Sequence, residues 1–231
     1  MLGILGGMGP LSSAEFLKTV YEYSSFVSRV EQETPAVIVY SDPSFPDRTE
    51  AFLRGEDDKI LDKLVPTLRR MQEIGATTIV TCCVTIHYLY PRLPDDIRRS
   101  LVSVIDVIYD TLLERRGKHL MLCSTGSRNI NLFERHPDWD RVKDFVLFLD
   151  DNHQDRLHEL IYQMKHNRSN DEMTAFLESL LPIYGVDSFI VGCSEIHMVA
   201  KRDQESGSAF NENCWIDPFA SIARKFTEDT L

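Results

Sequence analysis

Hydrophobic and polar positions follow two periods along the chain, one typical of buried strands and one typical of amphipathic helices. Short apolar runs predict strands at residues 2–5, 36–41, 77–82, 102–106, 118–123, 144–150 and 187–193. Apolar residues at helical spacing predict helices after residue 10 and at 58–74, 157–164 and 173–183. A further helix is predicted to follow residues 102–106 and to run to about residue 116. This alternation of strands and helices predicts an α/β fold with parallel strands.

The first predicted strand runs into a glycine-rich turn, Gly6-Gly7-Met8-Gly9-Pro10. Two starts are open for the helix that follows. Pro10 fits the first helical turn, whereas Ser12 with Glu15 has the spacing of a capping box. The sequence does not choose between them.

The two halves of the chain resemble one another. An offset of 110 residues, which places Cys83 on Cys193, aligns GATTIVTCCVTIH (75–87) with GVDSFIVGCSEIH (185–197). The segments DPSFPDR (42–48) and DDNHQDR (150–156) share their first Asp and their final Asp-Arg. Two similar α/β halves would each present a cysteine at a strand's carboxyl end, where open α/β sheets bind ligands.

The composition is that of a globular protein: 231 residues, 43% hydrophobic and 26% charged. A net charge of −11 argues against sequence-independent binding to nucleic acid or to an anionic membrane surface. We find no apolar run near the roughly 20 residues of a membrane span and no secretory signal pattern. We therefore expect a cytoplasmic protein whose partner is a small molecule.

Five cysteines, an odd number without a C-x-x-C pair, fit neither a disulfide framework nor a zinc site: Cys82, Cys83, Cys123, Cys193 and Cys214. A single free cysteine is usually a small buried residue. Two cysteines at equivalent points of a duplicated chain instead suggest a pair that acts on one substrate from opposite sides. One thiolate would remove a proton from carbon and the other thiol would return one to the opposite face, which inverts the centre.

Five motifs, in this order, give the chain a specific resemblance: GILGGMGP at the start, PDRT at 46–49, CVTIH at 83–87, TGS at 125–127 and GCSEI at 192–196. With them the chain resembles the aspartate/glutamate racemase superfamily, most closely its aspartate racemase branch. The resemblance implies a cofactor-independent amino-acid racemase that acts on an acidic amino acid, with aspartate ahead of glutamate. It also implies a homodimer without a metal site.

The fold that the resemblance implies has two similar Rossmann-like domains with parallel sheets, related by pseudo-two-fold symmetry, and an active site in the cleft between them. We expect residues 1–100 and 210–231 to form the N-terminal domain, with the C-terminal helix returning to it. Residues 101–209 would form the second domain.

The resemblance assigns catalysis to Cys83 and Cys193 and implies a set of substrate-binding residues: Met8, Gly9, Arg48, Val84, Thr85, Thr125, Ser127, Lys165, Ser194 and Glu195. Arg48 and Lys165 would bind the two carboxylates. Read without the family, Arg48 is equally a surface loop arginine and Lys165 a solvated helix lysine.

Other polar residues of the motifs have structural readings beside the functional ones. The hydroxyl residues are also typical turn or cap residues, and Glu195 either tunes Cys193 or favours a helix N-terminus. His87 and His197 either reach the chemistry or are satisfied elsewhere in the fold. Cys82 is expected to pack on the opposite face from Cys83.

The chain departs from the family pattern after the first cysteine, where Asn-Thr-Ala-His is usual and Val84-Thr85-Ile86-His87 stands here. Val84 has no side-chain donor or acceptor. Ser194 in place of the common threonine keeps the hydroxyl. These changes leave open a racemase or isomerase with an altered substrate, and a weakened protein that only binds an acidic metabolite. A nucleotide-binding Rossmann protein is a third reading, but the N-terminal glycines lack the G-x-G-x-x-G spacing.

Overall fold

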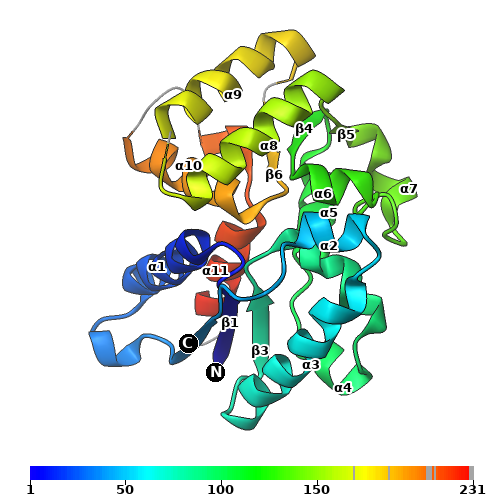
Figure 1. Ribbon diagram of the computed structural model, residues 1–231. Coiled ribbons are helices and arrows are strands. Elements are labelled where there is room, and N and C mark those ends of the chain that lie inside the picture. The colour runs from blue at the N-terminus through cyan, green and yellow to red at the C-terminus, as the bar shows by residue number, and fades with distance from the viewer. Residues whose placement is uncertain (169, 187, 207–209, 211, 229–231) are drawn as a thin grey trace.

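The computed structural model describes residues 1–228 except 169, 187, 207–209 and 211. Its strands form two separate parallel sheets, one in each half of the chain (Figure 1). The first sheet has the order β2-β1-β3 and the second the order β5-β4-β6-β7. The strands are β1 (Leu2–Gly6), β2 (Val37–Ser41), β3 (Thr78–Thr81), β4 (His119–Leu122), β5 (Val146–Leu147), β6 (Phe189–Val191) and β7 (Trp215–Ile216).

Helices cover both sheets and connect the strands. The α-helices are α1 (Pro10–Val27), α2 (Arg48–Leu53), α3 (Asp57–Glu73), α4 (Asp95–Arg98), α5 (Val104–Arg115), α6 (Thr125–Asn129), α7 (Trp139–Val142), α8 (Asp151–Lys165), α9 (Asn170–Tyr184), α10 (Ser194–Ser206) and α11 (Pro218–Glu228). Short 3₁₀ helices are η1 (Glu31–Glu33), η2 (Val84–Arg92), η3 (Lys143–Phe145) and η4 (Glu212–Cys214). None of the described helices has the length and apolar character of a membrane span.

The two sheets repeat one topology. Ile79 of β3 forms a parallel bridge with Leu101, and Phe189 of β6 pairs with Trp215 of β7 in the same relative position. With this bridge the first sheet extends to a fourth position, which matches the four-stranded order of the second. The predicted fold class, two similar parallel α/β halves, is therefore confirmed.

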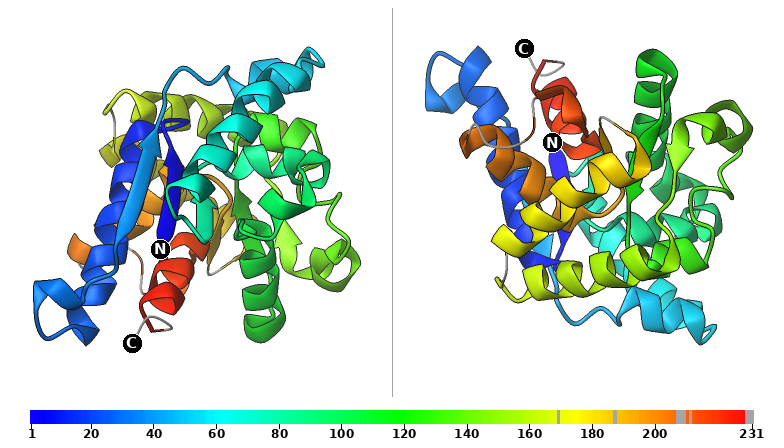
Figure 2. Two further views of the ribbon diagram at one scale, coloured as in Figure 1. Left: turned by 90° about the horizontal axis from the view of Figure 1, so that it is seen from below. Right: turned by 90° about the horizontal axis from the view of Figure 1, so that it is seen from above.

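The C-terminal helix α11 follows the second sheet but packs against α1 of the first half and against α5 (Figures 1 and 2). A continuous apolar cluster joins Leu2 and Phe16 of the first half to Phe189 and Phe219. A second cluster lies between the first sheet and α3 and contains Ile60. The expected domain limits stay a prediction; residues 207–209, at the second boundary, lie outside the described residues.

Two strand predictions were wrong in detail. Residues 104–106 of the predicted strand 102–106 are the start of α5, because the Ser103 side chain accepts a hydrogen bond from the backbone N–H of Asp106 and begins the helix at Val104. The two-residue strand β7 was missed, since so short an apolar run carries no period. Asp187, the first residue of the predicted strand 187–193, lies outside the described residues.

The glycine turn after β1 takes the first of the two open helix starts, with Pro10 in the first turn of α1. Gly7 has a φ of 89°, and a Cβ there would lie 2.3 Å from the Asp42 backbone. Gly9 has a φ of 151°. Glycine is therefore required at both positions for the turn to bring its backbone close to neighbouring segments.

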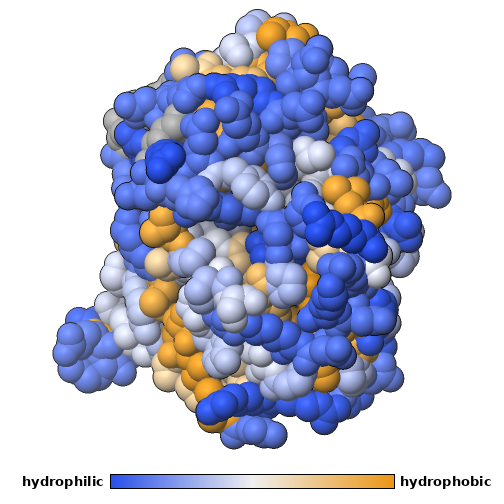
Figure 3. Space-filling model, in the orientation of Figure 1, coloured by the Kyte–Doolittle hydropathy of each residue, from blue (hydrophilic) through white to orange (hydrophobic). Residues whose placement is uncertain are grey.

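The surface on the face shown in Figure 3 is mainly hydrophilic, with hydrophobic residues in separate patches. This agrees with a chain whose acidic residues outnumber its basic ones and whose large apolar side chains are mostly buried.

Candidate active site

Cys83 and Cys193 lie at equivalent points of the two halves, each two residues beyond a central strand, β3 or β6. A helical segment begins at the next residue in both cases, η2 after Cys83 and α10 after Cys193. The two side chains are buried and line the same pocket. The fold thus brings together two cysteines that are 110 positions apart in the sequence.

The pocket takes residues from both halves. Its lining residues are Met8, Asp47, Arg48, Thr49, Cys83, Val84, Thr85, Ser124, Lys165, Cys193, Ser194 and Glu195. Most residues singled out from the sequence are among them. Gly9, Thr125 and Ser127 lie just outside it, whereas Asp47, Thr49 and Ser124 were missed.

Arg48, at the start of α2, is buried, and its guanidinium faces Cys83. One terminal nitrogen donates to the Pro46 carbonyl and the other to the Met8 carbonyl, both at 2.9 Å. The Nε atom has no partner among the described residues. Burial alone would lower the pKa of Arg48, but the charges of Cys83 and Asp47 hold it above its usual value. Arg48 is a fixed cation with a free donor.

Cys193 has the opposite electrostatic surroundings. Its Sγ donates to Glu195 Oε2 at 3.0 Å. Burial, and then the Glu195 charge, raise the pKa of the Cys193 thiol well above its usual value. An arginine therefore faces one sulfur and a carboxylate faces the other, which makes the pair asymmetric in charge.

Ser194 joins the second half to the first beside the pocket. Its hydroxyl lies 3.0 Å from Ser12 Oγ, which also lies 2.9 Å from the Gly9 carbonyl. Ser194 Oγ also lies 3.3 Å from the Cys82 carbonyl. These contacts hold the first turns of α1 and α10 together and fix the backbone next to Cys193.

The rim of the pocket is closed by contacts from α8 to the segment before α2. Tyr162 donates to Asp47 Oδ2 at 2.7 Å, and Lys165 Nζ lies 4.1 Å from the centre of the Tyr162 ring. Lys165 is also close enough to Cys193 to oppose the rise in the pKa of that thiol. Lys165 therefore lies at the pocket on the same turn of α8 as Tyr162, whose hydrogen bond to Asp47 connects the two halves.

A cluster of hydroxyl groups also lines the pocket. Thr85 Oγ1 lies 2.9 Å from Ser127 Oγ and 3.3 Å from Ser124 Oγ. Ser124 is the N-cap of α6 and reaches the pocket, while Ser127 lies behind it. The sequence analysis missed Ser124. Its place between the end of β4 and the start of α6, where a hydroxyl residue often caps a helix, could have indicated it. Thr125 Oγ1 is buried without a partner among the described residues.

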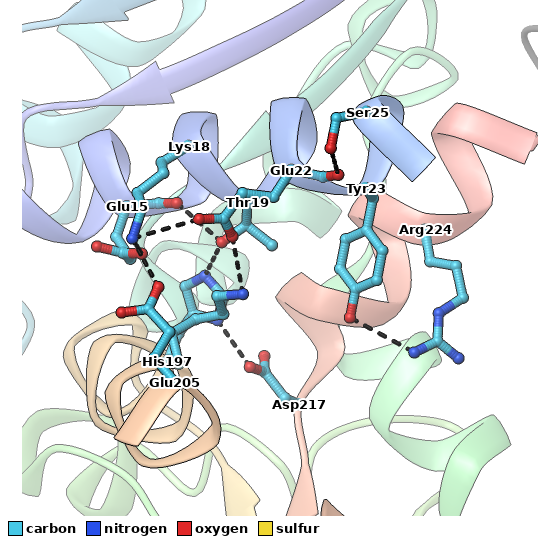
Figure 4. Close-up of polar contacts among 11 residues, drawn as sticks. Glu15, Lys18, Thr19, Glu22, Tyr23, Ser25, His197, Glu205, Asp217 and Arg224 are labelled. Atoms are coloured by element: carbon cyan, nitrogen blue, oxygen red, sulfur yellow. Dashed lines mark hydrogen bonds and ion pairs between the residues drawn. The ribbon is translucent and has the colours of Figure 1, made fainter. Parts of the chain in front are cut away.

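The two histidines that follow the cysteines have structural partners. His87 Nδ1 lies 3.0 Å from the Val84 carbonyl, and its Nε2 accepts from the Val104 backbone N–H at the start of α5. Burial lowers the pKa of His87 to about 4. His197 bridges Thr19 and Asp217, at 3.1 and 2.7 Å, in front of α11 (Figure 4). His87 therefore contacts the start of α5, which follows the first sheet, and His197 contacts the residue before α11, which follows the second sheet.

Cys82 is fully buried and belongs to the apolar cluster that spans both halves, whereas Cys83 belongs to the cluster on the α3 side. Burial raises the pKa of the Cys82 thiol well above its usual value. Consecutive residues on a strand point to opposite faces, which separates the packing cysteine from the pocket cysteine. Among the described residues, no cluster of three or more His, Cys, Asp or Glu side chains could hold a metal ion.

A family model described as Asp/Glu/Hydantoin racemase matches residues 5–224. The chain belongs to this racemase family. The match includes both cysteines and all the residues that line the pocket. The racemase resemblance noted from the sequence motifs is therefore confirmed at the level of the family.

Solved structures share the fold at low identity. Aspartate racemase from Picrophilus torridus is 20% identical, with a TM-score of 0.75 over 98% of this chain and 94% of that one. An aspartate racemase homologue from Pyrococcus horikoshii OT3 is 21% identical, with a TM-score of 0.68 over 99% and 98%. Glutamate racemase from Campylobacter jejuni is 14% identical, with a TM-score of 0.60 over 100% and 85%. At these identities the likeness establishes the fold.

Proposed function

We propose that this chain interconverts the L and D forms of an acidic amino acid, aspartate first and glutamate second, by proton transfer between Cys83 and Cys193. The observation that carries the proposal is the joint presence of the two cysteines, from equivalent strand ends, in one pocket with Arg48 and Lys165. Two sulfurs supply an acid and a base, and two cations suit a substrate with two carboxylates.

In one direction, Cys83 acts as the thiolate and takes the proton from the α-carbon. The electron pair of the broken C–H bond stays on the substrate, where Arg48 and Lys165 offset the added negative charge. Cys193 then gives its thiol proton to the opposite face of the same carbon. The product is the other enantiomer, Cys83 ends as the thiol and Cys193 as the thiolate, and the reverse reaction or solvent exchange restores the starting state.

The proposal includes the finer expectations that the resemblance carries: activity without pyridoxal phosphate or metal, a homodimeric assembly, and a cytoplasmic location. Activity that survives exhaustive dialysis against a chelator and an aldehyde-trapping reagent supports the first. The mass of the protein in solution, measured by light scattering, tests the second.

The decisive experiment follows α-carbon deuterium exchange in heavy water with L-aspartate and L-glutamate. We expect exchange in the wild-type protein and a loss of at least about 100-fold in Cys83→Ser and Cys193→Ser. Cys82→Ala, which removes the neighbouring sulfur outside the pocket, is the matched control and should retain exchange. Absence of exchange with both amino acids would contradict the proposal.

A second function is favoured by one observation, the apolar Val84 in the pocket wall. A chain that has lost the polar side chain at this position could bind an acidic metabolite without turning it over. Thermal stabilisation by aspartate or glutamate without deuterium exchange would support this alternative.

A further inference from the structure

The Glu195 carboxylate has one oxygen that is buried and has no hydrogen-bond partner among the described residues. The side chain is only 2% exposed and lies in the first turn of α10. Oε2 accepts from Cys193 Sγ at 3.0 Å and from Ser194 Oγ at 3.3 Å. Oε1 has no hydrogen-bond partner within the described part of the chain. A buried carboxylate oxygen without a partner is costly, so a missing donor is indicated.

The fold makes room for this oxygen. A Cβ on Gly9 would stand 2.3 Å from Glu195 Oε1, so the absence of a side chain at Gly9 allows the carboxylate to sit there. The glycine turn of the first half and the first turn of α10 in the second half therefore fit together around Oε1. The carboxylate is held in place by its neighbours rather than left at a surface.

Asp47 is the other carboxylate that lines the pocket, and it is already engaged. Its Oδ1 accepts from the Glu50 backbone N–H at 3.0 Å and its Oδ2 accepts from Tyr162 at 2.7 Å. Glu195 is therefore the pocket carboxylate with a free acceptor among the residues described.

The free groups of the pocket have a definite charge pattern. Arg48 offers an unpartnered Nε donor, Lys165 offers a second cation, and Glu195 offers an acceptor. Arg48 is near enough for the Glu195 charge to raise its pKa, yet no ion pair joins these two described residues. Two positive groups and one negative group complement a ligand with two carboxylates and one ammonium group.

We propose that the Glu195 carboxylate binds the α-ammonium group of the substrate and makes the pocket select amino acids over dicarboxylic acids that lack the amine. This inference rests on the proposed racemase function and names the group that recognises its substrate class. Val84, which also lines the pocket, has no polar side-chain atom to do so. A diacid without the amine leaves Oε1 unpaired and lacks the positive charge that offsets the repulsion between Glu195 and the ligand's carboxylates, so selection has an attractive and a repulsive part.

Calorimetry with two matched ligand pairs, aspartate against succinate and glutamate against glutarate, tests the proposal. We expect the wild-type protein to bind the amine-bearing member of at least one pair about 10-fold or more tightly, as for a charged hydrogen bond. Glu195→Gln keeps the shape of the side chain and an acceptor for Cys193. In this variant the amino acid should bind more weakly and the diacid more tightly, so the two affinities of a pair should differ by no more than about 3-fold. Glu50→Gln removes an exposed carboxylate from α2 and should leave the ratio unchanged.

Two results would overturn the proposal: a wild-type protein that does not prefer the amino acid in either pair, and a Glu195→Gln ratio equal to that of the wild type. A fall in exchange rate with an unchanged ratio would show that Glu195 acts only through Cys193. If Glu195→Gln does not fold, the affinity of the wild-type protein for malate tests the proposal instead. Its neutral hydroxyl should give an affinity between those of aspartate and succinate, and malate binding as tightly as aspartate would contradict the ammonium site.

The outcomes separate this inference from the proposed function. A protein that shows the ligand preference but no deuterium exchange keeps the ammonium site and loses the racemase proposal. If the wild-type protein exchanges deuterium and Glu195→Gln keeps the full ligand preference, the racemase proposal stands and the ammonium site is contradicted.

Discussion

Tyr162 on α8 donates a 2.7 Å hydrogen bond to the Asp47 carboxylate, which caps α2 in the other half of the molecule. The contact crosses the pocket rim directly beside Arg48 and Lys165. Asp47 therefore has two tasks: it begins the helix that carries Arg48 and it ties that helix to the second half. The burial of Tyr162 and its bond to Asp47 raise the pKa of its hydroxyl, so it remains a donor at neutral pH.

Tyr162→Phe should weaken substrate binding more than it slows the chemical step. Removal of one hydrogen bond to a charged group costs about 1–2 kcal/mol, so we expect KM for the acidic amino acid to rise roughly 5- to 30-fold while kcat changes less than about 3-fold. Steady-state racemisation measured by circular dichroism gives both constants.

Tyr184→Phe is the matched control for this substitution. The Tyr184 hydroxyl also donates to an aspartate, Asp150 at 2.9 Å, but that pair is exposed and does not line the pocket. Its KM should equal that of the wild type. Equal effects of the two substitutions would contradict a specific role for the Tyr162–Asp47 contact.

The alkylation of Cys193 should report its electrostatic surroundings. Only the thiolate reacts, and burial together with the Glu195 charge raises the pKa of this thiol, so the thiolate fraction is small at pH 7 and increases as the pH rises. We expect slow labelling by iodoacetamide at pH 7, faster labelling at pH 9, and faster labelling at every pH in Glu195→Gln.

Cys123 provides an internal comparison within the same digest. Burial raises the pKa of its thiol to about 12, and Glu195 is not among the causes. Peptide mapping by mass spectrometry should therefore show that Glu195→Gln changes the labelling of Cys193 and leaves that of Cys123 alone. Unchanged labelling of Cys193 would mean that the carboxylate does not control this sulfur.

The internal repeat was the strongest source of correct expectations about the fold. Because Cys83 and Cys193 follow strands that the repeat aligns, the sequence alone predicted that they occupy equivalent points, and the matching order of the two sheets agrees. Local patterns were sufficient for α3 and for the second half of α8. They failed at residues 102–106, where the Ser103 cap outweighed the β-branched residues that favoured a strand.

The residues that the sequence could not supply are those whose position depends on contact between the halves. Asp47 resembles an ordinary loop carboxylate until Tyr162 is placed 2.7 Å away by α8, which is 115 residues further along the chain. The histidines show the same limit. The sequence left open whether they reach the chemistry, because the partners of His197 are Thr19 and Asp217, which the folded chain alone brings together.

Asp217→Ala should destabilise the protein strongly. The Asp217 carboxylate is buried, pairs with the fully buried His197 and accepts two backbone N–H groups at the start of α11. Loss of one partner from such a buried group costs about 3 kcal/mol of unfolding free energy. Urea unfolding followed by circular dichroism measures this cost.

Asp106→Ala is the surface counterpart, because Asp106 lies 2.7 Å from His136 but is more than half exposed. An exposed pair of this kind contributes at most about 1 kcal/mol. If both substitutions cost the same, the Thr19–His197–Asp217 contact does not anchor α11 in the way the structure indicates.

Val84 offers a final test of what the pocket lacks. Its side chain is 2% exposed, lines the pocket beside Cys83 and packs into the larger apolar cluster. Val84→Asn should lower the unfolding free energy by about 1–2 kcal/mol, because a buried amide loses water. The same amide adds a donor for a polar substrate, and we expect KM for aspartate to fall roughly 5-fold. Val84→Ala opens space without adding a polar group, so it should leave KM unchanged or raised. If Val84→Ala lowered KM as much as Val84→Asn, pocket size rather than missing polarity would limit the binding of aspartate.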